Sequence, residues 1–251
     1  MKIGLQSLKI MQINDHVWLL NDDDQAACCV VAGLDQAMVI DTMMGFVDVR
    51  HTAEALTGLP LICVNTHGHG DHIGGNWAFG AAHMHPADLP IADGFLHDPE
   101  ILKAIRENGI AFPPFRPIAD GELFDLGGLA LQAYHLPGHT PGEIVLLDRA
   151  DRILFTGDGI ITHLWMQLPH SLPLSTQINS LKRIRPLRPQ YDMILHGHST
   201  EPESAELYDA LLAAAIDLES GNTDSDEDYH WHGGVCRAHP YGQNRKIVYN
   251  P

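Results

Sequence analysis

Hydrophobic and polar residues alternate in short blocks along the first 60 residues, and the apolar blocks have the length of β-strands. Three apolar runs bounded by polar residues are typical of buried strands, at 16–20, 26–33 and 37–42. Polar turns separate them at 21–25 and 33–36. Residues 46–58 differ, because their apolar positions recur at helical spacing and end in a glycine, which predicts a helix. Residues 61–66 then predict another short buried strand.

The remainder of the chain continues this alternation of strands and helices. Short apolar runs predict strands at 81–86, 129–137, 143–150, 152–158, 191–198 and 246–250. Helical spacing predicts helices at 98–109, 175–187 and 203–220. Residues 87–122 are otherwise irregular and carry a proline-rich stretch, and we interpret them as an insertion over a site rather than as a linker. We therefore predict a single α/β domain that spans residues 1–251.

Composition and charge limit the classes of partner. Hydrophobic residues make up 45% and charged residues 19% of the 251 residues, an ordinary globular balance that allows a sizeable core. The formal net charge of -17 argues against a nucleic-acid partner and against docking on anionic membranes, since both need a basic surface. A small-molecule partner is the expectation that remains.

The N-terminal sequence and the cysteines predict a cytoplasmic protein. The first 15 residues contain no apolar run of signal-peptide length, and no stretch reaches the roughly 20 apolar residues of a membrane helix. None of Cys28, Cys29, Cys63 and Cys236 lies in a C-x-x-C motif, so we expect reduced, mostly buried thiols. A disulfide between Cys63 and Cys236 is the alternative. The adjacent Cys28 and Cys29 should point to opposite faces of a strand.

The stretch "NTHGHGDHIGGN" at 65–76 places four metal-ligand side chains within six positions: His67, His69, Asp71 and His72. Glycines separate and follow them, and we expect these glycines to give the loop backbone conformations that other residues avoid. Imidazole and carboxylate groups suit zinc and other borderline divalent metals. A histidine-rich surface loop is the alternative, because the chain has 17 histidines. The position of the stretch, directly after a buried strand, favours the metal site.

Further candidate ligands follow three later strands. His139 lies in "LPGHTPGE", Asp158 in "ILFTGDG", and His196 and His198 in "MILHGHST". Each is typical of an ordinary turn residue when taken alone. Together with the first cluster, their repeated position after a strand predicts that they converge on the same metal site.

These motifs occur in an order that resembles a known family, the metallo-β-lactamase-fold hydrolases. The resemblance rests on "VIDT" at 39–42, then "THGHGDH", "PGHTPG", "FTGD" and the Gly-His turn after "MIL", and it spans about residues 15 to 200. It implies a four-layer αβ/βα sandwich of two mixed β-sheets with helices on the outer faces. It places the site at one edge of the sandwich.

The resemblance also implies two divalent metal ions, with zinc favoured and manganese or iron as alternatives. By position it assigns His67, His69 and His139 to the first ion, Asp71, His72 and His198 to the second, and Asp158 to both. His198 is favoured over His196 as the ligand, which leaves His196 next to the ligands or facing substrate. Asp41, from the first motif, is a candidate for ordering the loop, and an ordinary strand-end residue is the alternative.

Two such ions about 3.5–4 Å apart can share a bridging hydroxide that attacks an electrophilic carbonyl or phosphorus, with Asp71 orienting it and carrying a proton. We therefore predict a metal-dependent hydrolase of a small ester, thioester, lactone or phosphoester, in the branch that resembles glyoxalase II and lactonases. A mononuclear iron oxidoreductase of the sulfur-dioxygenase kind is the alternative, and it would leave the second ligand set incomplete. A metal-binding protein without catalysis is the third hypothesis.

The sequence says less about substrate contacts. We name His163, Trp165, His170 and His196 as candidate substrate-binding residues, because the segment after Asp158 would wall the pocket in the resemblance. Apolar side chains of the same segment and of the insertion could line it too: Met166, Phe112 and Phe115. Ordinary packing is the favoured interpretation for each of these apolar side chains.

Overall fold

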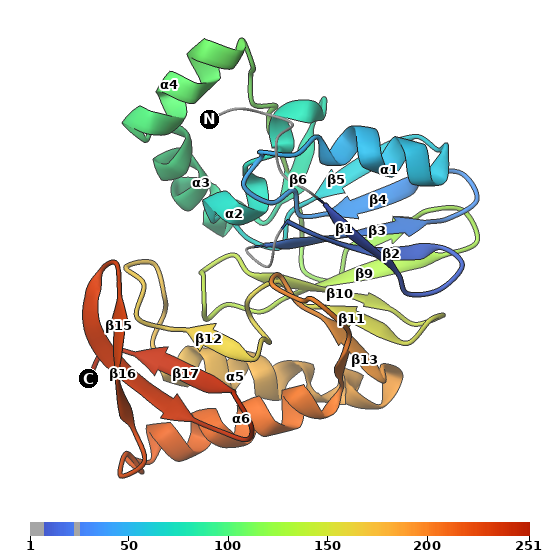
Figure 1. The fold of residues 1–251 in the computed structure, drawn as a ribbon. Coiled ribbons are helices and arrows are strands. Elements are labelled where there is room, and N and C mark those ends of the chain that lie inside the picture. The colour runs from blue at the N-terminus through green and yellow to red at the C-terminus, as the bar shows by residue number, and fades with distance from the viewer. Residues whose placement is uncertain (1–7, 23–25) are drawn as a thin grey trace.

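Two β-sheets packed face to face form the centre of the molecule (Figure 1). The structure is a computed structural model that describes residues 8–22 and 26–251, so the predicted turn at 21–25 lies mostly outside the described residues. The first sheet has seven strands in chain order: β1 (Lys9–Gln12), β2 (Val17–Asn21), β3 (Ala27–Ala32), β4 (Ala37–Ile40), β5 (Leu61–Val64), β6 (Ala82–Met84) and β7 (Phe115–Pro117). The second sheet has six strands, in sheet order β14 (Glu203–Ser204), β13 (Met193–Leu195), β11 (Ile153–Phe155), β10 (Ile144–Asp148), β9 (Ala130–His135) and β8 (Leu123–Asp125).

Both sheets are mixed. In the first, β1 to β4 pair antiparallel and β4 to β7 pair parallel. In the second, β11 and β13 pair parallel, and the remaining neighbours pair antiparallel. Because parallel neighbours end at the same edge of a sheet, the loops that leave β5 and β6 lie together, as do those that leave β11 and β13.

Helices cover the two outer faces, which confirms the predicted αβ/βα sandwich (Figure 1). The helix α1 (Val49–Thr57) packs on the first sheet. It begins after Asp48, whose carboxylate accepts a hydrogen bond from the His51 backbone N–H, and ends at Gly58 with a left-handed φ of 66°. The helices α5 (Leu174–Ile184) and α6 (Glu206–Glu219) pack on the second sheet, and a short 3-10 helix (Arg185–Gln190) follows α5. Within residues 8–22 and 26–251, no helix combines the length and apolar character needed to cross a membrane.

The main core lies between the sheets, where Leu19 and Val31 of the first sheet pack with Leu146 and Phe155 of the second. Cys29 joins this core, whereas Cys28 points to the α1 side, as the alternation of side chains along a strand requires. All four cysteines are free and buried, which agrees with the reduced thiols expected from the sequence.

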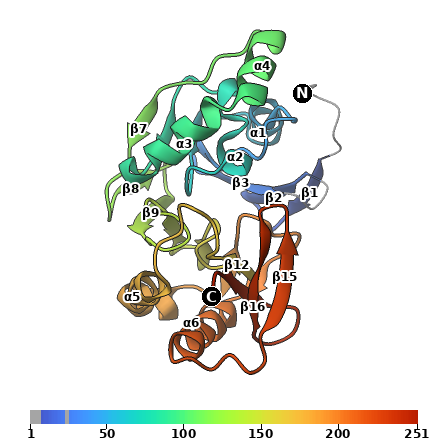
Figure 2. The same ribbon diagram turned by 90° about the vertical axis from the view of Figure 1, so that its left-hand side faces the viewer.

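A third sheet, which the sequence did not predict, stands at the end of the second half. Its four strands are β12 (His163–Trp165), β17 (Lys246–Tyr249), β16 (Gly234–Pro240) and β15 (Glu227–Trp231), in that order. Only β17 was expected, because the alternating residues of β15 are mostly polar and exposed and give no apolar strand pattern. Figure 2 shows this sheet beside α6, which contacts β16.

Residues 87–122 form two helices and the edge strand β7. The predicted helix at 98–109 is α4 (Pro99–Asn108), which is capped by Asp98 and ends at Gly109. The helix α3 (Leu89–Leu96) was not predicted, since it is short and contains a proline and a glycine. Aromatic side chains of this segment pack on one another, with the Phe95 and Phe112 rings 6.4 Å apart. That the segment covers the site stays a prediction.

Candidate metal centre

The loop after β5 carries the first candidate ligands and continues into the short helix α2 (Gly70–Ile73) and a 3-10 turn (Asn76–Ala78). Its glycines are needed for space and not, as the sequence suggested, for unusual backbone angles, since none of those between 68 and 75 has a positive φ. A Cβ on Gly68 would lie 2.7 Å from the Asp88 carbonyl oxygen, and one on Gly70 would lie 2.4 Å from the Phe95 ring. The loop is therefore pressed against the chain that surrounds it.

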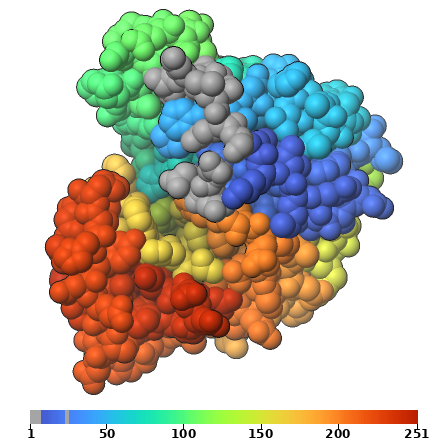
Figure 3. Space-filling model, viewed as in Figure 1, coloured from blue at the N-terminus to red at the C-terminus, as the bar shows by residue number. Residues whose placement is uncertain are grey.

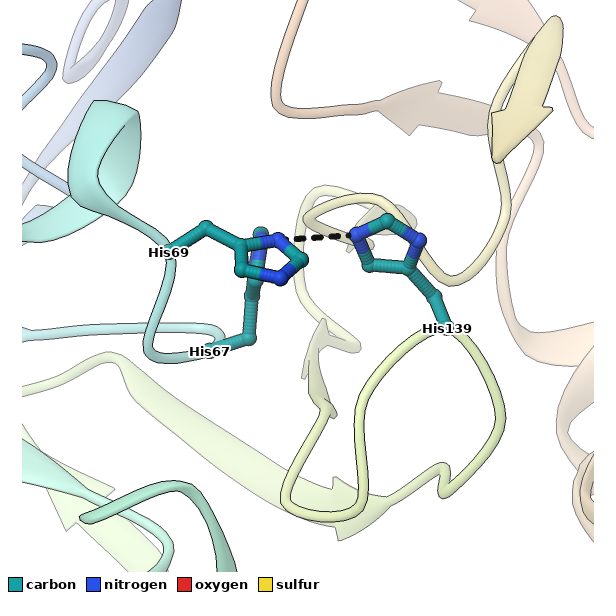
Figure 4. A group of neighbouring side chains, drawn as sticks. All are labelled: His67, His69 and His139. Atoms are coloured by element: carbon teal, nitrogen blue, oxygen red, sulfur yellow. Dashed lines mark hydrogen bonds between the residues drawn. The ribbon is translucent and has the colours of Figure 1, made fainter. Parts of the chain in front are cut away.

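Three imidazoles meet beyond this loop, as Figure 4 shows: His67, His69 and His139. The His69 Nδ1 lies 3.1 Å from the His67 Nε2 and 3.1 Å from the His139 Nε2. Burial lowers the pKa of all three, so each ring is neutral and offers a lone pair. Three convergent lone pairs form a ligand set that zinc prefers.

A second group lies beside the first and contains Asp71, His72 and His198. The Asp71 Oδ2 is 3.6 Å from the His72 Nε2 and 3.5 Å from the His198 Nε2. Burial lowers the pKa of His198, but the Asp158 carboxylate outweighs this effect and raises it to about 9. The group therefore attracts positive charge.

Asp158 lies between the two groups. Its Oδ2 is 3.7 Å from the His139 Nε2 of the first group and 3.3 Å from the His198 Nε2 of the second. Its Oδ1 and the His72 Nε2 are buried 3.7 Å apart, and neither has a hydrogen-bond partner among the described residues. Buried polar atoms are rarely left without a partner, and a bound cation would supply one for both. The residues present thus fit the binding of divalent metal, and Asp158 lies within reach of both groups.

Hydrogen bonds behind the ligands fix which ring nitrogen faces the centre. Asp41, which has a φ of 63°, accepts hydrogen bonds from the Thr66 N–H at 2.8 Å and the Thr66 hydroxyl at 2.7 Å, and its carboxylate lies 2.9 Å from the His72 Nδ1. The His139 Nδ1 donates to the Trp165 carbonyl oxygen at 2.7 Å. Both contacts leave the Nε2 lone pair directed at the site. Asp41 therefore orders the loop, as the sequence suggested.

Two buried acids behind the ligands were missed by the sequence interpretation. The Asp88 carboxylate accepts hydrogen bonds from the Gly68 N–H (2.9 Å), the Thr140 hydroxyl (2.7 Å) and the Gly142 N–H (2.5 Å), and so joins the two histidine loops. The Glu143 Oε1 accepts from the Asp158 N–H at 3.0 Å. Glu143 follows the "PGHTPG" motif directly, which was an available signal, whereas no motif marks Asp88.

A cavity of about 630 Å³ opens above the candidate ligands. Five of these ligands are part of its wall: His69, Asp71, His139, Asp158 and His198. The other two, His67 and His72, are buried beneath the wall. Apolar side chains line the rest of the wall, namely Ile161, Trp165 and Leu168. Figure 3 shows the red C-terminal hairpin and the green α3–α4 segment on either side of a notch in the outline of this face.

The candidate substrate-binding residues divide into two groups. His163, Trp165 and His196 line the cavity, whereas His170 is exposed and does not. The three further apolar candidates are absent from the wall, so for them the structure supports ordinary packing over a place in the pocket. Met166 packs into the core of the second half, while Phe112 and Phe115 pack within the α2–α4 region.

Comparisons with known proteins agree with this geometry. A family model described as "Metallo-beta-lactamase superfamily" matches residues 21–214. The acyl-coenzyme A thioesterase MBLAC2 of Homo sapiens is 30% identical over 205 residues, which cover 70% of this chain and 73% of that protein. The probable metallo-hydrolase YybB of Bacillus subtilis (strain 168) is 30% identical over 166 residues, covering 61% of this chain and 64% of the relative. The solved structure of a metallo-beta-lactamase from Pontibacter korlensis superposes with a TM-score of 0.65 at 19% identity, covering 84% of this chain and all of that one (100%).

Proposed function

The chain belongs to the metallo-β-lactamase superfamily, and from that premise we propose that it is a metal-dependent hydrolase of small acyl thioesters or esters. The observation that carries this proposal is the position of Asp158 between two complete groups of ligand-type side chains on the wall of one cavity. A purely structural metal site is usually closed, whereas this one opens to a space of substrate size.

Each residue of the site has a separate role in the proposed hydrolysis. Bound zinc ions would polarise the acyl carbonyl and lower the pKa of the attacking water. The Asp71 carboxylate, which is partly exposed in the cavity, orients that water and accepts its proton at an oxygen. The C–S or C–O bond of the substrate breaks, the acyl group leaves as a carboxylate, and the thiol or alcohol leaves with a proton. His72 and His139 are held in their orientations by Asp41 and the Trp165 carbonyl.

Two features favour thioesters and esters over the other substrates considered. MBLAC2 is named as an acyl-coenzyme A thioesterase, and a second relative is named as the atrochrysone carboxyl ACP thioesterase AgnL7 of Paecilomyces divaricatus, at 29% identity over 138 residues. The cavity wall combines the polar floor with apolar side chains and contains no lysine or arginine among the described residues that line it. Such a wall offers the apolar part of an acyl group a surface to pack against, next to the polar floor.

The arrangement supports the hydrolase over the iron dioxygenase alternative. That alternative needs only the first ligand set and leaves the second incomplete. Here the ligand-type atoms of Asp71, His72 and His198 also lie within 4.8 Å of one another, as do those of the first three histidines. Two bound ions would use every one of these side chains as a ligand.

The proposal is tested by thiol release from acyl-coenzyme A substrates and from an uncharged S-acyl thioester. We expect turnover that a chelator abolishes and added zinc restores. His69→Ala should lose at least about a hundredfold of the activity, because it removes a side chain shared by the ligand set and the cavity wall. His51→Ala, an exposed histidine of α1, serves as the control and should behave as wild type. Full activity in His69→Ala, or no turnover of any thioester or ester, would overturn the proposal.

A further inference from the structure

The third sheet brings the end of the chain against the candidate site. Its strands β15, β16 and β17 follow residue 214, where the match to the family model ends. β17 pairs in parallel with β12, so that Trp165 lies opposite Val248. The Met166 N–H donates to the Val248 carbonyl oxygen at 2.7 Å, and the Lys246 N–H donates to the Thr162 carbonyl oxygen at 3.0 Å. The C-terminal strand therefore holds the segment that walls the cavity.

Aromatic side chains of this sheet gather behind Trp165. The Trp165 ring lies 5.6 Å from the Trp231 ring and 6.4 Å from the Tyr229 ring, both in edge-to-face geometry. Trp231 continues the cluster to His232, with 4.6 Å between ring centres. At the hairpin turn, a Cβ on Gly233 would lie 2.2 Å from the Trp231 ring, so the absence of a side chain there lets the indole fold over the turn. Edge-to-face aromatic pairs hold each other in place.

The cluster reaches the cavity through Trp165, and Tyr229 and Trp231 pack behind it. Trp165, Ile161 and Leu168 line the cavity, and Trp165, Tyr229 and Trp231 are each only partly buried. Because neither lysine nor arginine lines this space, phosphate groups of a carrier have no partner there. The apolar part of a substrate is what this wall can bind, since it gains from leaving water against aromatic rings.

We propose that Trp165, supported by Tyr229 and Trp231 of the C-terminal hairpin, binds the acyl chain of the substrate and selects long apolar acyl chains over short ones. This inference rests on the proposed function and deepens it, because it names which half of the thioester enters the cavity. The carrier of the thioester remains outside, at the mouth. The hairpin, which lies beyond the family match, sets the specificity of a site that the rest of the chain builds.

The test compares acetyl, octanoyl and dodecanoyl thioesters of one carrier across four variants. Trp165→Ala and Trp231→Ala should lower kcat/KM for the two long chains about tenfold or more. In Trp231→Ala, whose side chain does not line the cavity, the value for the acetyl substrate should change less than about twofold. Trp231→Phe should recover most of the loss, because it restores an aromatic edge. Val235→Ala, an exposed residue of the same hairpin, is the matched control and should leave the chain-length profile unchanged.

A second readout does not need turnover. Binding of dodecanoate and of acetate, measured by calorimetry in the same variants, should show the same loss for dodecanoate alone in Trp231→Ala. Equal losses for short and long chains in either assay, or an unchanged profile in folded Trp231→Ala, would overturn the inference. If wild type hydrolyses no thioester yet binds dodecanoate through Trp231, the proposed function fails while the acyl site stands.

Discussion

The carboxylate of Asp88 accepts a 2.9 Å hydrogen bond from the backbone N–H of Gly68, between the two histidines of the first loop. The same carboxylate accepts hydrogen bonds from Thr140 and Gly142, which follow His139 in its loop. One fully buried side chain thereby sets the distance between the loop of His69 and the loop of His139. These two histidines are 70 residues apart in the chain. The three histidines converge because this acid ties their backbones together.

Asp88→Asn tests that role. Asparagine keeps the shape but has one acceptor oxygen in place of two, so at least one of the three donors loses its partner. We expect metal affinity to fall about 10- to 100-fold and the free energy of unfolding to drop by about 1–3 kcal/mol. Chelator competition and denaturant unfolding measure the two effects. Asp93→Asn, an exposed acid of α3, is the control, and an Asp88→Asn protein that matches it would contradict the account.

Gly70→Ala tests the close packing of the loop on α3. The added Cβ would lie 2.4 Å from the Phe95 ring, so either the ring or the loop must move, at a cost of about 1–3 kcal/mol in stability. Combining Gly70→Ala with Phe95→Ala should cost less than the sum of the single changes, since the second change makes room for the first. Gly94→Ala meets no atom within 4 Å and should be neutral or stabilising. Additive losses in the double variant would disprove this contact.

Asp41 separates a backbone effect from a hydrogen-bonding effect. Its φ of 63° is tolerated by asparagine but strained for alanine. Asp41→Asn should therefore lose metal affinity through the weakened contact with His72, and should lose less stability than Asp41→Ala, because it keeps an acceptor oxygen and tolerates this φ. Asp41→Ala should lose both. Thermal unfolding and chelator competition on the two variants check this, and equal Tm values would show that the backbone conformation at Asp41 carries no strain.

The four cysteines should be inert in the folded protein. Burial raises the pKa of Cys28, Cys29, Cys63 and Cys236 above the ordinary value of 9.0, so the thiols stay protonated when the pH rises to 9. An unfolded chain loses those protons near pH 9, so this contribution to the free energy of unfolding is full below that pH and falls as the pH rises further. Ellman's reagent at pH 8 should react with none of the thiols until denaturant is added. Rapid reaction in native buffer would contradict their burial.

The sequence predicts the sandwich well where apolar patterning decides the structure. The strands β2 to β5 and β9 to β11 and the helices α1, α4, α5 and α6 occur within the predicted ranges or extend one residue beyond them, because each places an apolar face against one of the cores. The β15–β16 hairpin was missed for the converse reason. Its residues are largely polar. Its position is determined by pairing with β17 and by aromatic contacts with Trp165, which cannot be predicted from the local sequence pattern.

The candidate site shows the same division. The ligand-type residues are visible in sequence because they follow strands whose ends meet, and the structure gathers all seven of them. Asp88 was not visible, since its partners are backbone groups of loops far away in the chain. The loop glycines were noticed but misinterpreted. Glycine is needed at these positions because neighbouring atoms, such as those of the Phe95 ring, leave no space for a side chain. Only the packed structure brings these atoms close.

One chain should hold two divalent ions, and hydrolysis should require them. The most direct measurement is elemental mass spectrometry of the purified protein, prepared without added metal, with thiol release from an acyl thioester assayed on the same sample before and after chelation. We expect about two zinc ions per chain and activity that falls in proportion to the metal removed. One iron per chain, or thioester hydrolysis that persists after all metal is gone, would contradict this expectation.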